Sequence, residues 1–252
     1  LFTQADVVLR YIRMVLLPYG QNISHFVPIY KDFLRIEVIG SAAVHLIIIS
    51  TGIYLFFKNR LASFGILWFY LTIAVESSII VLADPMFEHR VYLPMAGYCF
   101  LLPALVFGWK YFEGRISYPA VFISVLIILL SFTAYFRVSL WDSGTALWTD
   151  AAEKSPQAER PFLMRGRIYL EQKEYGRAIE DFKKSLEINP VYKPALGHLG
   201  YTYFKTGMPK KAIMAYSRII LADKDNEKAY ENRGTVYAAL GKYPEALADF
   251  EK

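Results

Sequence analysis

Residues recur at a fixed step of 34 in the C-terminal part of the chain, and this period restricts the possible fold more than any other feature. Four columns agree over three copies of the step: a glycine, a tyrosine, an alanine and an aromatic residue. The members are Gly166, Gly200 and Gly234; Tyr169, Tyr203 and Tyr237; Ala178, Ala212 and Ala246; and Phe182, Tyr216 and Phe250. Small residues with aromatic residues on the neighbouring turn are what two closely packed antiparallel helices per repeat require. We therefore predict an all-α solenoid for this part of the chain.

A two-helix unit of 34 residues resembles the tetratricopeptide repeat (TPR). The resemblance covers residues 159–252, with the third repeat interrupted in its second helix. One step before Phe182 lies Trp148, so residues 141–158 are predicted to form a half-repeat that joins the array to the preceding segment. This joint contains no Gly/Ser-rich or Pro-rich linker, which predicts a rigid connection that limited proteolysis at residues 137–145 should not cut.

TPR arrays usually bind a peptide or protein in the groove lined by the first helix of each repeat. By register, the groove residues would be mainly basic and aromatic: Arg160, Leu163, Arg167, Leu170, Tyr201, Phe204, Lys205, Lys228 and Glu231. This mixture suits an extended segment with acidic character. The alternative is that Arg167 and Lys205 only solvate a helix surface. The Lys and Asn set with which some TPR domains clamp a C-terminal carboxylate is not reproduced.

The first 140 residues have a different composition from the repeats. They carry 17 charged residues, whereas residues 141–252 carry 34. A helix that crosses a hydrocarbon core of about 30 Å needs about 20 apolar residues. The stretches of this length lie near 38–57, 61–83, 91–109 and 116–136. We predict a polytopic transmembrane helix bundle at 36–140, the alternative being a set of buried helices in a soluble core.

The loop charges predict an orientation for this bundle. Lys58, Arg60, Lys110 and Arg115 lie in two short loops, which the positive-inside rule places in the cytoplasm. The N-terminal segment and the repeats would then lie on the other side. The chain is therefore predicted to be an integral membrane protein with its repeats in the periplasm, outside the cell or in an organelle lumen.

Residues 1–35 are predicted to contain an amphipathic helix, because apolar residues recur at helical spacing with Arg10 and Arg13 between them. Such a helix can lie in the membrane interface, where both arginines would contact lipid headgroups. The alternative is a short helix packed on the other spans.

Several classes of chemistry lack their sequence signals. One cysteine, Cys99, excludes a disulfide framework and a Cys-based zinc site. Phosphate-binding glycine loops, HExxH and nucleophile-elbow motifs are absent from the sequence, and the histidines are scattered, so we predict no metal and no cofactor. The net charge of +5 is not gathered in one segment, and no nucleic acid is expected as a partner.

Ionisable residues gather in the segment between the second and third apolar stretches. They are Asp84, Glu88, His89 and Arg90, with Glu76 inside the second stretch. Arginine presents paired donors to phosphate oxygens, histidine can move a proton, and carboxylates can orient both. A charge within a span is costly unless it is paired or faces a polar cavity. The alternative is a salt-bridge cluster that fixes the loop.

The segments EHRVYLP, ESSIIVLAD, VLRYIRMVLLPYGQN and WTDAAEKSPQAERPFLMRG resemble bacterial multi-spanning membrane proteins with C-terminal TPRs. This resemblance implies a location in the bacterial inner membrane, with the repeats in the periplasm or outside the cell. The arrangement is more distantly similar to the transmembrane-and-TPR protein O-mannosyltransferases, which have the GT-C fold. This resemblance implies transfer of a sugar from a polyprenyl-phosphate carrier to protein hydroxyls on the non-cytoplasmic face, with the repeats holding the acceptor. It also implies that Arg90 contacts the carrier phosphate, supported by His89 and Glu88.

The chain begins with Leu and ends within a helical pattern, so we expect a fragment whose catalytic acidic residue lies before Leu1. Two functions follow as hypotheses. One is the C-terminal part of a membrane glycosyltransferase for protein O-glycosylation. The alternative is a non-catalytic, membrane-anchored TPR scaffold that recruits protein partners for surface assembly. Membrane lipid and a protein or peptide in the TPR groove are the expected partners.

Overall fold

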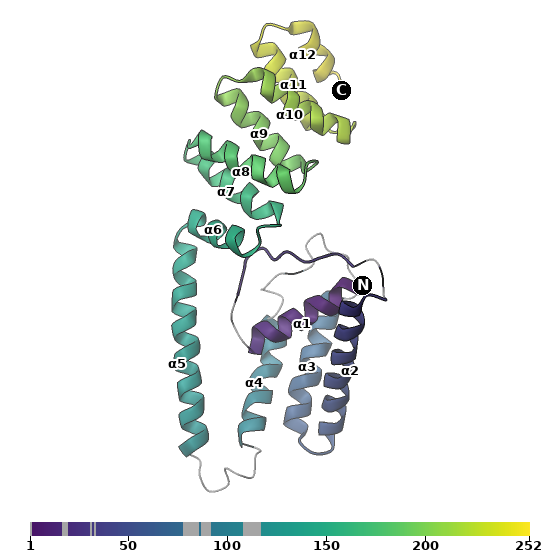
Figure 1. Ribbon diagram of the computed structural model, residues 1–252, viewed down its shortest axis with the longest axis vertical. Helices are drawn as coiled ribbons and strands as arrows, with labels where there is room; N and C mark the ends of the chain where they lie inside the picture. The colour runs from purple at the N-terminus through teal and green to yellow at the C-terminus, as the bar shows by residue number, and fades with distance from the viewer. Residues whose placement is uncertain are drawn as a thin grey trace. The chain divides into compact units, whose positions relative to one another are not determined.

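The computed structural model describes residues 2–16, 20–30, 32, 34–77, 86, 92–107 and 117–252. All regular secondary structure in these ranges is helical (Figure 1), which confirms the predicted all-α class. The chain divides into two compact units, Leu1–Ser139 and Leu140–Lys252.

The described residues of the first unit form five helices. They are α1 (Phe2–Leu16), α2 (Ile36–Phe56), α3 (Arg60–Ser77), α4 (Tyr92–Phe107) and α5 (Ser117–Ser139). Helices α3 and α4 approach each other backbone to backbone at Gly65 and Gly97: a methyl group on Gly65 would lie 2.6 Å from the Gly97 carbonyl oxygen. Small residues permit this close packing between apolar helices.

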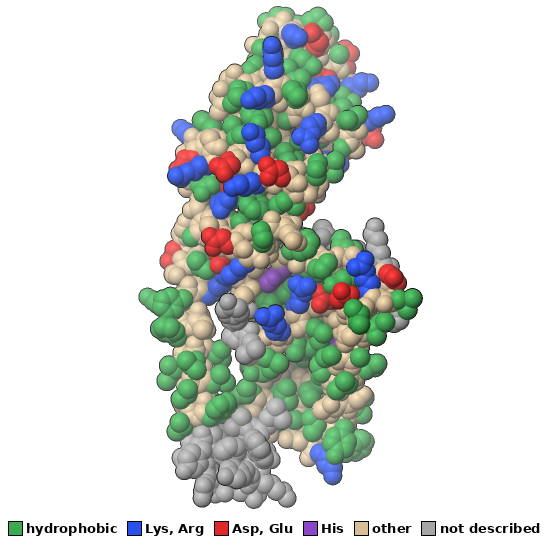
Figure 2. All heavy atoms as spheres, viewed as in Figure 1, with side chains coloured by type: hydrophobic (Ala, Val, Ile, Leu, Met, Phe, Trp, Pro, Cys, Tyr) green, Lys and Arg blue, Asp and Glu red, His purple; other side chains and the backbone are tan. Residues whose placement is uncertain are grey.

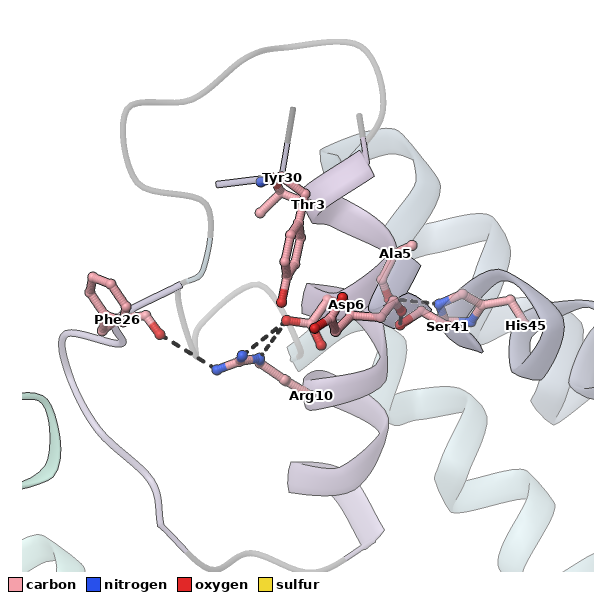
Figure 3. A network of polar contacts seen from close by, with 9 residues as sticks. Thr3, Ala5, Asp6, Arg10, Phe26, Tyr30, Ser41 and His45 are labelled. Atoms are coloured by element: carbon pink, nitrogen blue, oxygen red, sulfur yellow. Dashed lines mark hydrogen bonds and ion pairs between the residues drawn. The ribbon is translucent and has the colours of Figure 1, made fainter. Parts of the chain in front are cut away.

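Helix α1 packs on α2 and α3 through both apolar and polar contacts. Val7 and Tyr11 of α1 are fully buried in a cluster with Ile73 of α3. The His45 imidazole of α2 lies 2.8 Å from the Ala5 carbonyl oxygen of α1 (Figure 3). It also lies 2.8 Å from the Tyr70 hydroxyl of α3. One side chain thus links three helices. Helix α1 thus packs on its neighbouring helices, and its position in a membrane interface stays a prediction.

Two helical segments of the described ranges are long and apolar enough to cross a membrane, Ile36–Phe56 and Val121–Asp142. Helices α3 and α4 are apolar over shorter lengths, Arg60–Ala74 and Leu93–Ala104. Length and composition do not separate a membrane span from the core helix of a soluble protein. The four-span bundle therefore stays a prediction.

The second unit is an array of paired helices. After a 3₁₀ turn, η3 (Leu140–Asp142), come α6 (Gly144–Lys154), α7 (Glu159–Glu171), α8 (Tyr175–Ile188), α9 (Lys193–Lys205), α10 (Pro209–Ala222), α11 (Glu227–Ala239) and α12 (Tyr243–Phe250). The pairs α7–α8, α9–α10 and α11–α12 each correspond to one period of the sequence. Helix α6 precedes them and buries Trp148.

The repeated glycines are the points where paired helices touch. A methyl group on Gly166 would lie 2.7 Å from the Phe182 ring, and one on Gly234 would lie 2.7 Å from the Phe250 ring. The alanine column is buried as well, with Ala178 and Ala212 fully inaccessible. The predicted repeat packing is therefore confirmed.

The turn within each repeat uses a left-handed residue at the same step of the period. Gly207 and Gly241 have φ of 73°, and Lys173 holds the equivalent position with φ of 63°. Glycine adopts this conformation without a steric penalty, whereas a residue with a Cβ does not. The first repeat is therefore strained at Lys173.

Candidate functional site: the groove of the repeats

A groove of about 530 Å³ runs over the first helices of the second and third repeats. We call it the repeat groove. Its lining comes from α7, α9, α10 and α11 and their connections: Leu170, Lys193, Pro194, Gly197, His198, Tyr201, Tyr216, Ile219, Asn226, Lys228, Ala229 and Asn232. The described lining contains two lysines, two asparagines and a histidine but no Asp or Glu.

His198 forms part of the floor of the repeat groove. Its ring stacks on Phe182, with centroids 5.6 Å apart and planes 17° from parallel. Burial lowers the pKa of His198 below its ordinary 6.5, and the positive charges of Arg167 and Lys228 lower it further. The imidazole is therefore neutral near pH 7 and offers one donor and one acceptor.

One end of the repeat groove is fixed by a polar network. Lys193 Nζ lies 2.7 Å from a carboxylate oxygen of Asp223, and the Asn226 amide donates to the same oxygen at 3.2 Å. The Lys193 hydrogen bond lowers the pKa of Asp223, with a further contribution from Asn226. The Asn226 side-chain oxygen also accepts from the Ala229 N–H at 3.0 Å and caps α11. The charge of Lys193 is thus largely balanced within the protein.

Lys228 lies exposed on the first turn of α11, one turn before Asn232. Together with His198 and Tyr201 on α9, these side chains give the repeat groove imidazole, phenol, amide and ammonium groups beside an apolar floor. Such groups can bond to the backbone and acidic side chains of an extended peptide.

The structure separates the predicted groove residues into two sets. Leu170, Tyr201 and Lys228 line the repeat groove, whereas the remaining ones do not: Arg160, Leu163, Arg167, Phe204, Lys205 and Glu231. Leu163 and Phe204 belong to the hydrophobic core of the repeats. The Lys205 ammonium lies 5.4 Å from the Tyr201 ring centroid, which is a cation–π contact with a groove residue.

Sequence reasoning missed His198, Asn232, Lys193 and Asn226. The sequence does contain a signal for the first two. His198 lies three residues before Tyr201, and Asn232 lies four residues after Lys228, so each shares a helix face with a residue that was predicted to line the groove. The other two lie at helix starts, where their roles depend on the packing of consecutive repeats.

The other predicted site residues do not gather at a described site. Asp84, Glu88, His89 and Arg90 lie outside the described residues, as do the predicted span ends at 78–83 and 108–109. Glu76 belongs to α3, but its side chain is not among those described.

The two arginines of α1 differ in their surroundings. The Arg10 guanidinium is 2.9 Å from the Asp6 carboxylate and donates to the Phe26 carbonyl at 3.5 Å (Figure 3), whereas Arg13 is exposed. Arg10 is therefore engaged within the protein, although 38% of its side chain is exposed, and Arg13 presents its side chain to the surroundings. Contact of either one with lipid headgroups stays a prediction.

The chain has similarity to parts of larger curated proteins. It is 34% identical over 89 residues to tetratricopeptide repeat protein 13 of Homo sapiens, covering 35% of this chain and 10% of that protein. It is 32% identical over 83 residues to serine/threonine-protein phosphatase 5 of Homo sapiens, covering 33% of this chain and 17% of that protein. Neither match supports the resemblance to membrane glycosyltransferases.

Solved structures with related helices include a crystal structure of MamA, at 20% identity and a TM-score of 0.43, covering 69% of this chain and 93% of that one. Another is the second TPR of Spaghetti (RPAP3) bound to the HSP90 peptide SRMEEVD. It is 28% identical with a TM-score of 0.37, covering 40% of this chain and 93% of that one.

Two sequence models of the tetratricopeptide repeat match the chain, one at residues 161–192 and the other at residues 199–252. These ranges cover most of α7, the whole of α8, the second half of α9 and the whole of α10–α12, the paired helices that carry the 34-residue columns. The C-terminal part of this chain is built of tetratricopeptide repeats.

Proposed function

We propose that the chain is a partner-binding scaffold whose repeat groove holds an extended, acidic peptide segment of another protein. The observation that carries this proposal is the lining of the repeat groove, which combines Lys228 and a neutral His198 with two asparagines and has no carboxylate among its described members. Tyr201, 43% exposed, adds a rigid apolar surface with a polar end. Peptide binding is also the general use of tetratricopeptide repeats.

A carboxylate on the bound segment would pair with Lys228 and lie close to His198. A charge-assisted hydrogen bond of this kind contributes about 1.5–3 kcal/mol, which is about tenfold or more in affinity. Backbone groups of the peptide would bond to Asn232 and the imidazole, and its apolar side chains would cover Leu170.

Peptide binding by the full chain in detergent micelles tests this proposal. A peptide array that pairs each Asp- or Glu-containing sequence with its Asn or Gln counterpart should show retention of the acidic members. Lys228→Ala and Tyr201→Ala should each weaken retention about tenfold. Lys224→Ala is the matched control, because this exposed lysine is outside the groove lining and should have little effect. Equal loss in all three variants would contradict the proposal.

We further propose that residues 1–139 anchor the scaffold in a membrane. The support is the apolar surface of α2 and α5, where large hydrophobic side chains are exposed along the helices (Figure 2). None of the apolar window in Val121–Asp142 is buried. Exposed apolar surface of this extent is typical of a protein or membrane contact. Retention of the chain in the membrane fraction after alkaline carbonate extraction tests the anchor, and release into the supernatant would contradict it.

The glycosyltransferase hypothesis makes a separate claim, since it requires donor-binding residues in the segment from Asp84 to Arg90. In the full-length protein, Arg90→Ala should abolish sugar transfer and weaken binding of the polyprenyl-phosphate donor. Normal transfer by this variant would reject a role for Arg90. The scaffold is the function we favour, because the family and relatives that match the chain support the repeats alone.

A further inference from the structure

The first repeat and the third repeat each have a buried ion pair that joins the two helices of that repeat. In the first repeat, Arg165 donates to both carboxylate oxygens of Asp181 at 2.7 Å, and to the Thr149 hydroxyl of the preceding helix at 3.2 Å. The side chains are only 15% and 4% exposed. The guanidinium therefore fills the space between three helices.

The third repeat reproduces this arrangement with the same geometry. Arg233 donates to the two oxygens of Asp249 at 2.8 and 2.7 Å, and to the Ser217 hydroxyl of the preceding helix at 2.9 Å. All three positions lie two periods of 34 after those of the first repeat.

The middle repeat lacks every member of this arrangement. One period after Arg165 is Leu199, one period after Asp181 is Ala215, and one period after Thr149 is Lys183. The guanidinium and the carboxylate are both gone, and a lysine stands where the other repeats have a neutral hydroxyl.

A cavity opens where the ion pair is missing. Leu199, Ala215 and Lys183 all line a pocket of about 470 Å³ between α8, α9 and α10, which we call the α8–α10 pocket. Its floor is apolar, because Leu199 and Ala215 are only 6% and 5% exposed. Met214 stands at 67% exposure in the lining and presents a flexible apolar side chain.

The lining of the α8–α10 pocket carries more positive than negative charge. It contains three cationic side chains, Lys183, Lys211 and Arg218, but only one carboxylate, Glu187. Two of the cations have contacts within the protein: Lys211 lies 5.5 Å from the Tyr203 ring centroid, and Arg218 donates to the Pro190 carbonyl at 2.6 Å. Neither contact neutralises a charge, so the pocket is complementary to an anion.

We propose that the α8–α10 pocket is a second protein-binding site, which takes an acidic side chain flanked by an apolar one from a partner polypeptide. The partner carboxylate replaces the missing Asp of the middle repeat and pairs with Lys183. The partner's apolar side chain covers Leu199, where the other repeats have the arginine stem. This site is lined by α8, α9 and α10 and shares no lining residue with the repeat groove.

The test uses the same peptide array with the full chain in detergent micelles and a rebuilt variant, Lys183→Ser, Leu199→Arg and Ala215→Asp. The rebuilt variant restores the ion pair of the other repeats and fills the pocket. Peptides with Asp or Glu beside Leu, Ile or Phe should bind the unmodified chain. Their Asn or Gln counterparts and the rebuilt variant should both give affinities at least about tenfold weaker.

Lys183→Glu provides a second variant that does not alter the core, since Lys183 is exposed. It should weaken binding of these peptides about tenfold, whereas Lys224→Glu, an exposed control outside the lining with the same charge change, should not. Lys228→Ala should leave them bound, which separates this site from the repeat groove.

Three results would overturn the proposal. The first is that no peptide in the array both requires its Asp or Glu for binding and binds more weakly to Lys183→Glu. The second is a rebuilt variant that unfolds cooperatively yet binds as the unmodified chain does. The third is capture of vesicles containing anionic lipid, lost in Lys183→Glu, without any such peptide; this would assign the pocket to a lipid headgroup.

Discussion

Gly200 and Tyr216 are packed so closely that a methyl group added to Gly200 would lie 2.9 Å from two atoms of the tyrosine ring. The same relationship joins a glycine of the first helix to an aromatic ring of the second helix in each of the other two repeats. Glycine is required here by the distance between helices and not by backbone conformation, because these residues have ordinary helical geometry.

Gly200→Ala should therefore destabilise the repeats by about 1–2 kcal/mol, since the ring or the helix must move to accept the methyl group. Gly176→Ala is the matched control, because nothing lies within 4 Å of the added atom. Alanine also favours a helix, so this control should be neutral or slightly stabilising. Urea unfolding of both variants checks the difference, and equal midpoints would contradict the packing argument.

Lys173→Gly should stabilise the first repeat by about 1 kcal/mol, because Lys173 occupies the left-handed conformation that its counterparts fill with glycine. Gly207→Ala places the opposite change at the equivalent turn and should be destabilising by a similar amount. Thermal unfolding measures both shifts. Destabilisation by Lys173→Gly would show that the lysine side chain contributes more than its backbone strain costs.

Asp181→Ala should cost about 3 kcal/mol, because it leaves the Arg165 guanidinium buried without its bidentate partner. Glu180→Ala removes the neighbouring carboxylate, which pairs with Lys184 at the surface, and should leave the unfolding midpoint unchanged. Chemical denaturation monitored by circular dichroism distinguishes the two. Equal free energies of unfolding for the two variants would show that the buried pair contributes no more to stability than the surface pair.

Stability should fall as the pH drops below about 6.5, because His198 binds a proton more readily in the unfolded chain than in the fold. Because folding lowers the pKa of His198, the contribution of the neutral imidazole to the free energy of unfolding is complete above the pKa of the unfolded chain. This contribution decreases as the pH falls toward the pKa of His198 in the folded chain. His198→Gln should remove this part of the pH dependence.

An NMR titration of His198 provides the direct measurement. Lys228→Ala should raise its pKa, because one of the two positive charges that lower it is removed, while Glu171 acts in the opposite direction. A bound acidic peptide should raise the pKa as well, so affinity should increase toward pH 6. An unchanged pKa on peptide binding would place the carboxylate away from this ring.

His45→Ala should loosen α1, because it removes the side chain that bonds to the Ala5 carbonyl and the Tyr70 hydroxyl. Only the bond to Ala5 reaches α1, and the loss of about 1 kcal/mol for this one hydrogen bond raises the population of open states of α1 about fivefold. Trypsin cleavage after the exposed Arg13 reports this opening. Thr51→Ala is the control in the same helix, since its hydroxyl donates only to the Ile47 carbonyl of α2.

The periodic columns predicted the helix pairs of the repeats and the contacts between them. This worked because a 34-residue step fixes which residues face the partner helix, whatever the surface residues are. The repeat groove was predicted less completely. Periodicity identified Tyr201 and Lys228, but the reach of a side chain and its neighbours on the next repeat decided that His198 lines the groove and Phe204 does not.

The sequence by itself determined that the chain ends in paired helices of tetratricopeptide repeats and begins with apolar helical segments, because local periodicity and composition carry both signals. The tertiary structure alone decided what happens where the period fails. Leu199 and Ala215 could have let the helices close over the lost ion pair of the middle repeat. Instead, the Leu and Ala side chains do not fill the volume that Arg and Asp occupy in the other repeats, and an open, positively charged pocket remains between α8, α9 and α10.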